Sequence, residues 1–199
     1  MALSTHTSTS LLVGLAEAEN DAVWAEFDAR YRPIVTGYCL KLGLTEHEAA
    51  DVAQESLMRF LEEYRAGKYD RERGRLRSWL IGIVKYRVAD LKRAKFARRE
   101  LRGESAVVDL PDDDQLEALW EAERCHQLLR QAISELRGAS RLTERTMRAF
   151  EMFAVEQKPA AAVAAELGIS VQDVYVAKNR VAARLRETLE RLEALFDDR

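Results

Sequence analysis

Residues that interrupt helices are scarce in this chain. Its 199 residues include nine glycines, three prolines and only two cysteines. So little turn-forming sequence argues against a fold of many short strands, and the long stretches rich in Ala, Leu, Glu and Arg favour helix by intrinsic propensity. The two isolated thiols, Cys39 and Cys125, indicate no disulfide framework and are typical of a reducing compartment. We therefore predict an all-α fold.

Long hydrophobic runs are also absent. No segment approaches the roughly 20 apolar residues that cross a bilayer, and the apolar run at residues 11–16 is too short for a secretion signal. We therefore expect a cytoplasmic protein without membrane insertion.

Sequence signatures of catalysis are missing too. The chain has no P-loop and no glycine-rich dinucleotide turn. His6, His47 and His126 are scattered, and the pair Cys125-His126 falls short of the several ligands that a metal site needs. The sequence predicts no enzyme activity, no cofactor and no metal site.

What the sequence does contain is charge in blocks. The net charge is −3, but residues 17–63 carry 4 basic and 11 acidic side chains, whereas residues 65–99 carry 13 basic and 3 acidic ones. Residues 100–123 then carry 1 basic and 9 acidic side chains. Such blocks indicate one surface for polyanions and others that avoid polyanions or bind a basic partner.

The last acidic block suggests a division of the chain. Residues 109–114 combine Pro111 with a dense cluster of aspartates, which repels itself and resists helix. We interpret residues 102–120 as a linker between a helical domain at 20–101 and a second helical domain at 121–196.

Three helices are expected in the first domain, at about 21–43, 46–64 and 76–99. The second of them begins after Thr45, because Thr45 followed three positions later by Glu48 is the capping-box pattern.

The second domain is predicted to end in a helix-turn-helix. Helical sequence covers 121–137 and 143–156, followed by a short helix at 159–167 and a long last helix. Gly168 fits the left-handed residue that ends a helix. Ser170 fits the cap of the last helix, with Asp173 as its partner.

This last helix has an apolar side and a polar side. At about 100° per residue, Val174, Val181 and Leu192 share a stripe that must pack on other helices. The opposite side presents amide and small apolar groups flanked by arginines, which suit base edges and phosphates. We favour a helix that reads the major groove over a plain surface helix. The candidate DNA-binding residues are Gln172, Tyr175, Val176, Lys178, Asn179, Arg180 and Arg184.

The helix at 46–64 is two-sided as well. Its polar side, here called the acidic strip, consists of Asp51, Gln54, Glu55, Met58 and Glu62, within about 100° of the circumference. By pattern alone a solvated face is the simpler interpretation. The exposed Met58 among acids and an amide instead indicates a binding surface for a basic partner.

The segment 68–99 combines cations with aromatic rings. Nine Arg and Lys side chains fall in two clusters, at 71–77 and 92–99, and aromatic residues such as Trp79 and Tyr86 lie between them. A positive groove with aromatic platforms binds single-stranded nucleic acid, because phosphates meet the cations and unstacked bases meet the rings. Trp79 is at the same time well placed for the core. We predict that the cationic surface binds a polyanion.

In this order, the three regions resemble the sigma-70 family of bacterial RNA polymerase initiation factors, specifically its small two-domain extracytoplasmic-function (ECF) group. The resemblance rests on "DVAQE" and "GRLRSWL" followed by "AAELGISVQDVYVAKNR", and it covers about residues 23–192. It implies a region 2-like first domain, a region 4-like second domain, and a connector that runs toward the RNA exit path of the polymerase.

The resemblance also implies roles for residues. Asp51, Gln54, Glu55 and Met58 would dock on the clamp helices of the largest polymerase subunit. The last helix would read the upstream (−35) promoter element, and the second domain would meet the flap of the second-largest subunit. An anti-sigma factor is a further partner that the family implies. The residues that would bind and melt the downstream (−10) element are Tyr69, Arg71, Arg73, Arg75, Arg77, Trp79, Lys85, Tyr86, Arg87 and Arg93.

Two positions depart from the family pattern. Tyr86 stands where an Asn is common, and Ala162 stands where a Glu is frequent before the helix-turn-helix. Two other interpretations of the whole chain stay open: a stand-alone helix-turn-helix regulator that binds DNA without polymerase, and a helical adaptor whose basic face contacts RNA or acidic proteins.

Overall fold

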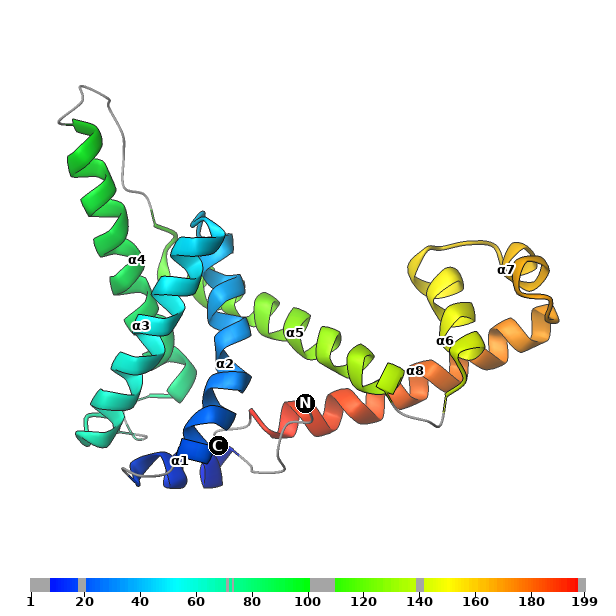
Figure 1. Cartoon of the computed structure of the whole chain (residues 1–199), viewed down its shortest axis with the longest axis horizontal. Coiled ribbons are helices and arrows are strands. Elements are labelled where there is room, and N and C mark those ends of the chain that lie inside the picture. Colours follow the sequence, from blue (N-terminus) through cyan, green and yellow to red (C-terminus); the bar gives the residue numbers. More distant parts are fainter. Residues whose placement is uncertain are drawn as a thin grey trace. The chain divides into compact units, whose positions relative to one another are not determined.

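The computed structural model describes residues 8–17, 21–70, 72, 74–100, 110–138 and 142–196, and all the regular elements there are helical, as predicted (Figure 1). The described residues divide into two compact units, one ending at Gln127 and the other spanning Leu128–Phe196. Unit 1 contains α1 (Ser8–Ala16), α2 (Asp21–Lys41), α3 (Glu46–Arg65), α4 (Leu76–Glu100) and the first part of α5 (Asp113–Gly138). Unit 2 contains the rest of α5, α6 (Glu144–Phe150), the π-helix η1 (Glu151–Val155), α7 (Ala160–Leu167) and α8 (Val171–Ala194).

An aromatic core ties α2, α3 and α4 together in unit 1. The apolar side of α3 is buried as predicted, including Val52, Leu57 and Phe60. The Phe60 ring stacks on Phe27 of α2 with 4.8 Å between the ring centroids. The same ring packs against Trp79 of α4 at 5.1 Å. Because α2 and α4 both meet α3 at this ring, the core fixes the position of the polar side of α3.

The capping box predicted for α3 is present. The Thr45 side chain accepts a hydrogen bond from the backbone N–H of Glu48, and the Glu48 carboxylate accepts one from the backbone N–H of Thr45. Both donors would otherwise lack partners at the helix start. The helix therefore begins at Glu46, where the sequence places it.

The helix α1 has no counterpart among the predicted elements. Its Leu11 and Leu15, one turn apart, are buried where α1 meets α2 and α3. The Tyr64 hydroxyl donates to the carbonyl of Leu12 at 2.9 Å, and the Arg65 Nε donates to the carbonyl of Leu15 at 3.1 Å. α1 therefore closes the C-terminal end of α3.

The acidic segment interpreted as a linker through residue 120 needs correction. α5 begins at Asp113, and the Asp112 carboxylate accepts a hydrogen bond from the backbone N–H of Gln115 at 2.8 Å, as an N-cap does. Aspartates resist the interior of a helix but stabilise its first turn, where the backbone dipole is positive. Residues 113–127 are a helical part of unit 1. The linker residues 102–109 lie outside the described residues.

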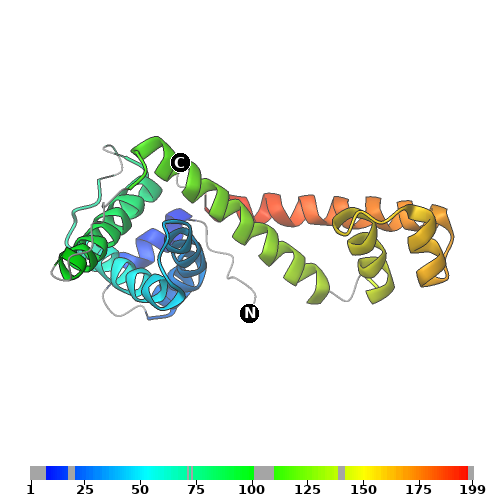
Figure 2. The ribbon, with the colours of Figure 1, turned by 90° about the horizontal axis from the view of Figure 1, so that it is seen from above.

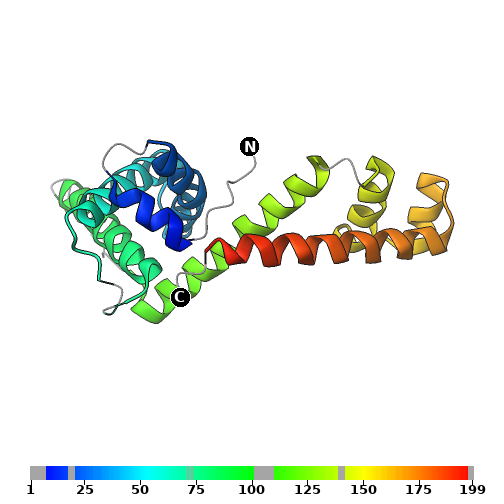
Figure 3. The same cartoon turned by 90° about the horizontal axis from the view of Figure 1, so that it is seen from below.

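Two helices joined by a short turn lie where the sequence predicts a helix-turn-helix in unit 2. α7 ends at Gly168, which adopts the left-handed conformation with φ 60° and ψ 45°. α8 begins after Ser170, whose capping box with Asp173 is complete. The axes of α7 and α8 differ in direction by 101°, within the range of about 90–120° typical of this motif. Figures 2 and 3 show α6 and α7 against the first half of α8, from opposite sides.

A second backbone irregularity lies between α6 and α7. The predicted helix at 143–156 changes from α-helix to the π-helix η1 at Glu151. Gln157, just beyond it, has a positive φ of 54°. Both features turn the chain so that Met152 and Val163 can share one buried cluster with Val174.

Candidate functional site

The acidic strip on α3 is exposed along its length. The side chains of Asp51, Gln54, Glu55 and Glu62 face solvent, and Met58 is 39 % exposed. Two of the strip's groups are held by neighbours on the same face. The Gln54 amide oxygen accepts a hydrogen bond from Arg32 of α2 at 2.6 Å. The Asp51 carboxylate lies 3.4 Å from the ring nitrogen of His47.

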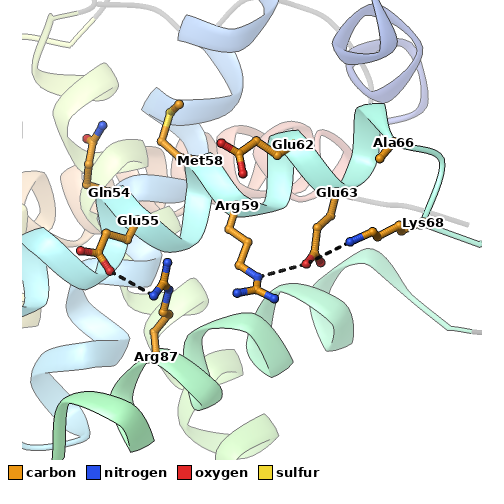
Figure 4. A pocket seen from close by; sticks show the side chains of 9 residues that line it. All are labelled: Gln54, Glu55, Met58, Arg59, Glu62, Glu63, Ala66, Lys68 and Arg87. Carbon is orange, nitrogen blue, oxygen red and sulfur yellow. Dashed lines mark hydrogen bonds and ion pairs between the residues drawn. The ribbon is translucent and has the colours of Figure 1, made fainter. Parts of the chain in front are cut away.

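An open groove of about 620 Å³ runs between the strip and α4 (Figure 4). Arg87 of α4 points toward Glu55 and pairs with it at 3.6 Å. Further along, Glu63 pairs with Arg59 at 3.0 Å and with Lys68 at 3.7 Å. Arg59, Glu63 and Lys68 were not among the predicted site residues. The helical spacing of Arg59 and Glu63 from Glu55 is a usable sequence signal, but the sequence alone does not show that α4 packs beside them. The groove is lined by Gln54, Glu55, Met58, Arg59, Glu62, Glu63, Ala66, Lys68 and Arg87.

Two of the aromatic residues of the cationic segment, Tyr69 and Trp79, lie together. Tyr69 and Trp79 are stacked on each other, with 5.3 Å between their centroids, and Tyr64 lies against Tyr69 at 5.9 Å. Tyr69 and Trp79 line a cavity of about 300 Å³ together with Arg75. Trp79 is half-buried, so it belongs both to the core and to the surface.

A second groove, of about 460 Å³, lies on the other side of Trp79. Tyr86 projects beside it and is 72 % exposed. Arg59, Glu63 and Arg87 line this groove as well as the one beside the acidic strip. The strip and the aromatic segment therefore border one continuous surface of α3 and α4.

Two of the predicted DNA-binding cations are turned toward α5 instead. Arg77 lies 3.9 Å from Glu117 and 3.5 Å from Glu121. Lys85 pairs with Asp113 at 2.6 Å, and this hydrogen bond raises the pKa of the lysine above its ordinary value.

The remaining predicted cations of this segment have different surroundings. Arg75 is exposed, and Arg93 pairs with Asp90 on the preceding turn of α4. Arg71 and Arg73 lie outside the described residues.

The polar side of α8 faces solvent as predicted. Gln172, Val176 and Asn179 are exposed, and Tyr175 packs edge-on against Phe153 at 5.5 Å. The opposite side is buried, as the stripe predicted. The other predicted residues of this helix are also exposed, and one of them, Arg184, pairs with Glu187 at 3.0 Å. These exposed flanking residues are Lys178, Arg180 and Arg184.

The described residues also bear on membrane crossing and on metal binding. No single helix there is long and apolar enough to cross a membrane; the bent pair α7 and α8 meets that test only when joined. No group of three His, Cys, Asp or Glu side chains there could hold a metal ion.

Comparison with known proteins identifies a family for part of unit 1. Residues 27–99 match the family model for sigma-70 region 2; they span most of α2, all of α3 and nearly all of α4. A solved structure described as CnrH in complex with the cytosolic domain of CnrY is 18% identical. The match covers 92% of this chain and 97% of that one, with a TM-score of 0.38. No curated protein sequence matches the chain.

Proposed function

We propose that the chain is a transcription initiation factor of the sigma-70 family, which binds core RNA polymerase and directs it to specific promoters, because residues 27–99 match the family model for sigma-70 region 2. The region 2 match carries the proposal, since it covers both the acidic strip and the aromatic groove. Within the family we assign the chain to the ECF group. It would act in the cytoplasm, where the polymerase is. A separate protein, an anti-sigma factor, would control its activity.

The acidic strip is the proposed contact with the clamp helices of the largest polymerase subunit. Asp51, Gln54 and Glu55 present two carboxylates and an amide to solvent, with Met58 as an apolar centre. Charge complementarity with a basic surface would guide the encounter, and burial of the methionine would add contact area.

The aromatic groove is the proposed site for melted −10 DNA. Trp79 and Tyr86 offer ring faces to unstacked bases, and Arg75 and Arg87 lie near enough to the groove to meet phosphates. Stacking tolerates any base. The preference for a −10 sequence would therefore come from side chains at the groove rim such as Tyr86, where the family commonly has an amide.

α8 is the proposed reader of the −35 element. Its Gln172, Tyr175, Val176, Asn179 and Arg180 lie within about 140° of the helix circumference and face solvent. A helix with such a face enters the major groove in helix-turn-helix proteins. The same unit would contact the flap of the second-largest subunit.

Binding to core polymerase tests the proposal. Asp51→Arg and Gln54→Ala should lose at least tenfold in affinity for core enzyme, since charged and amide contacts at the centre of an interface typically cost about 2 kcal/mol or more. Glu193→Arg, an exposed charge reversal on α8, is the matched control and should bind normally. Unchanged core binding by Asp51→Arg would remove the strip from the interface.

A stand-alone DNA-binding regulator is the second candidate. It is supported by the left-handed Gly168 and the Ser170 capping box at the predicted helix-turn-helix, which lies outside the family match. A gel-shift experiment with the isolated protein on duplex promoter DNA separates the two. The sigma factor requires core enzyme for specific binding, whereas a regulator binds a repeated half-site without it.

A further inference from the structure

The first turns of α5 carry three carboxylates on one face. Asp113, Glu117 and Glu121 follow one another at intervals of four residues, so they lie one above the other along the helix. Each of them approaches α4, within unit 1. We call this set the α5 stripe.

The carboxylates of the α5 stripe contact α4 in antiparallel order: residues later in α5 lie beside residues earlier in α4. Asp113 pairs with Lys85 at 2.6 Å. One turn further along α5, Glu117 accepts a hydrogen bond from the Ser78 hydroxyl at 3.2 Å. Arg77, the cation nearer the start of α4, lies between Glu117 at 3.9 Å and Glu121 at 3.5 Å. The two helices therefore run antiparallel, and the carboxylates take positions that successive phosphates of a strand can take.

Apolar contacts, not these ion pairs, hold α5 in place. Leu116 and Trp120 are buried, and Trp120 meets Tyr38 of α2 edge-on at 5.4 Å. By contrast, the side chains of Asp113, Glu117 and Glu121 are 84%, 51% and 40% exposed. Exposed ion pairs contribute little to stability and are screened by salt. Another anion can therefore replace them while the helix stays docked.

We propose that the α5 stripe is an internal competitor of single-stranded DNA, which occupies Arg77 and Lys85 in the free protein and yields them to phosphates when a melted promoter strand binds. This inference rests on the proposed function, because it takes Arg77 and Lys85 as DNA-binding residues. The α5 stripe competes only with the phosphates and leaves the sites for the bases open. Trp79 and Tyr86 line a groove to which no residue of α5 contributes among the described lining residues.

The competition weakens binding of the free protein to any single strand, since non-specific affinity comes from phosphate neutralisation. When polymerase and promoter hold the strand in place, the local concentration of phosphate is high enough to displace the carboxylates. The α5 stripe therefore lowers the affinity for free nucleic acid more than the affinity for a strand that the polymerase holds in place.

The experiment measures the affinity of the full chain, without polymerase, for a fluorescein-labelled 20-nucleotide single strand by fluorescence anisotropy. The test variant is Asp113→Asn/Glu117→Gln/Glu121→Gln, which removes three charges and keeps the shapes. The control variant is Asp114→Asn/Glu190→Gln/Glu193→Gln. It changes the net charge equally through exposed carboxylates that have no ion pair within the described residues.

The test variant should bind about tenfold more tightly than wild type at 50 mM salt, and the control about as wild type. The slope of log affinity against log salt should steepen by about 1.4, because two more phosphates are neutralised at ~0.7 each. Adding Arg77→Ala/Lys85→Ala to the test variant should abolish the gain. Asp113→Asn alone, at a position too exposed to unfold the chain, should steepen the slope by about 0.7.

Equal affinity of wild type and test variant overturns the inference, whether both bind or neither does. A gain that survives Arg77→Ala/Lys85→Ala overturns it as well, because the gain would then come from Arg124, which also pairs with Glu121. None of these outcomes affects the proposed function. That proposal is judged separately by core binding of Asp51→Arg.

Discussion

At the scale of the residue, one glycine decides how closely α5 can approach α2. Glu123 of α5 is buried against Gly37, and a Cβ added at Gly37 would lie 2.1 Å from the Glu123 Oε1. The carboxylate is held there by the Lys41 ammonium at 3.1 Å and by the Gln127 amide at 2.7 Å. Any larger residue at position 37 must displace a buried charge together with its partners.

We expect Gly37→Ala to lower the free energy of unfolding by about 1–3 kcal/mol, the usual effect of overpacking. Gly82→Ala on α4 is the matched control. A Cβ there meets nothing within 4 Å, so the change should add about 0.5–1 kcal/mol by removing a helical glycine. Urea unfolding of both variants measures the difference. If Gly37→Ala were as stable as wild type, the close approach would be wrong. The double variant Gly37→Ala/Glu123→Ala should recover part of the loss.

A second residue-scale effect is a carboxylate whose pKa is shifted. A hydrogen bond from Lys95, with another from the Thr45 backbone, lowers the pKa of Glu48 below its ordinary value of 4.5. A group with a lowered folded-state pKa stabilises the protein above its unfolded pKa and stops doing so as the pH falls through the folded value.

Wild type should therefore exceed Glu48→Gln in unfolding free energy at pH 6, and the difference should shrink steadily as the pH falls below the ordinary carboxyl pKa of 4.5. The glutamine keeps the capping hydrogen bonds without the charge, so the pH dependence isolates the ion pair. Lys95→Ala should flatten the dependence in the same way. A constant difference between pH 6 and pH 3 would assign the effect to packing instead of charge. The measurement is urea unfolding at several pH values.

At the scale of the element, α1 is a short helix that depends on its partners for stability. Isolated helices of this length do not persist in water. α1 is held by the burial of Leu11 and Leu15 and by hydrogen bonds from Tyr64 and Arg65 to its carbonyls. Tyr64 in turn lies beside Tyr69, which stacks on Trp79. The N-terminal helix thus supports one end of the aromatic row at the proposed DNA site.

Leu15→Ala should destabilise unit 1 by about 2–5 kcal/mol, as large-to-small changes in a core do. Val13, on the same helix, is 64% exposed, and Val13→Ala should change stability by no more than about 0.5 kcal/mol. Chemical denaturation followed by tryptophan fluorescence compares the two. Equal effects would mean that α1 does not dock through Leu15.

The elements that the sequence predicted well are those whose ends and faces depend on local residues. α3 and α8 have capping boxes and one apolar side each, and both are visible without knowing what packs against them. The start of α5 is hidden in the sequence, because a run of aspartates also fits a linker of mutually repelling charges. Leu116 and Trp120, one turn apart and buried, carried the opposite signal, but only the presence of Tyr38 makes that burial favourable.

For the candidate site residues, too, features that depend on one helix alone are predictable from the sequence. Exposure of the acidic strip and of the α8 face depends on each helix alone and was predictable. The pairing of Arg77 and Lys85 with α5 depends on contacts between residues that are 44 and 28 positions apart in sequence. Nothing local to Arg77 or Lys85 encodes that contact. The same holds for the groove that Arg87 shares with Glu55.

At the scale of the whole molecule, the chain has separate cores. Unit 1 is built on the aromatic cluster around Phe60. Unit 2 has one cluster that includes Met152 and Val174 and another that includes Met147 and Val181. Interactions within a core unfold together, whereas separate cores can unfold independently.

Calorimetry should therefore resolve two unfolding transitions. Leu57→Ala in unit 1 and Val181→Ala in unit 2 remove fully buried groups. Each should lower only one transition, by roughly 4–8 °C per kcal/mol lost in unit 2 and somewhat less in the larger unit 1. Hydrogen exchange assigns each transition to its unit. A single transition that both variants lower equally would show that α5, which continues from one unit into the other, makes the chain one cooperative body.

The packing of α5 against α2 determines where the chain can be truncated to give a stable fragment of unit 1. The family match ends at residue 99, but the compact unit that contains it extends to Gln127. A fragment that stops at residue 101 would lack the Trp120 ring that packs on Tyr38. It would also lack the Glu123 side chain that packs against Gly37. Uncovered apolar surface of this kind drives self-association. Light scattering should find the fragment 1–101 aggregating at concentrations where the fragment 1–127 stays monomeric.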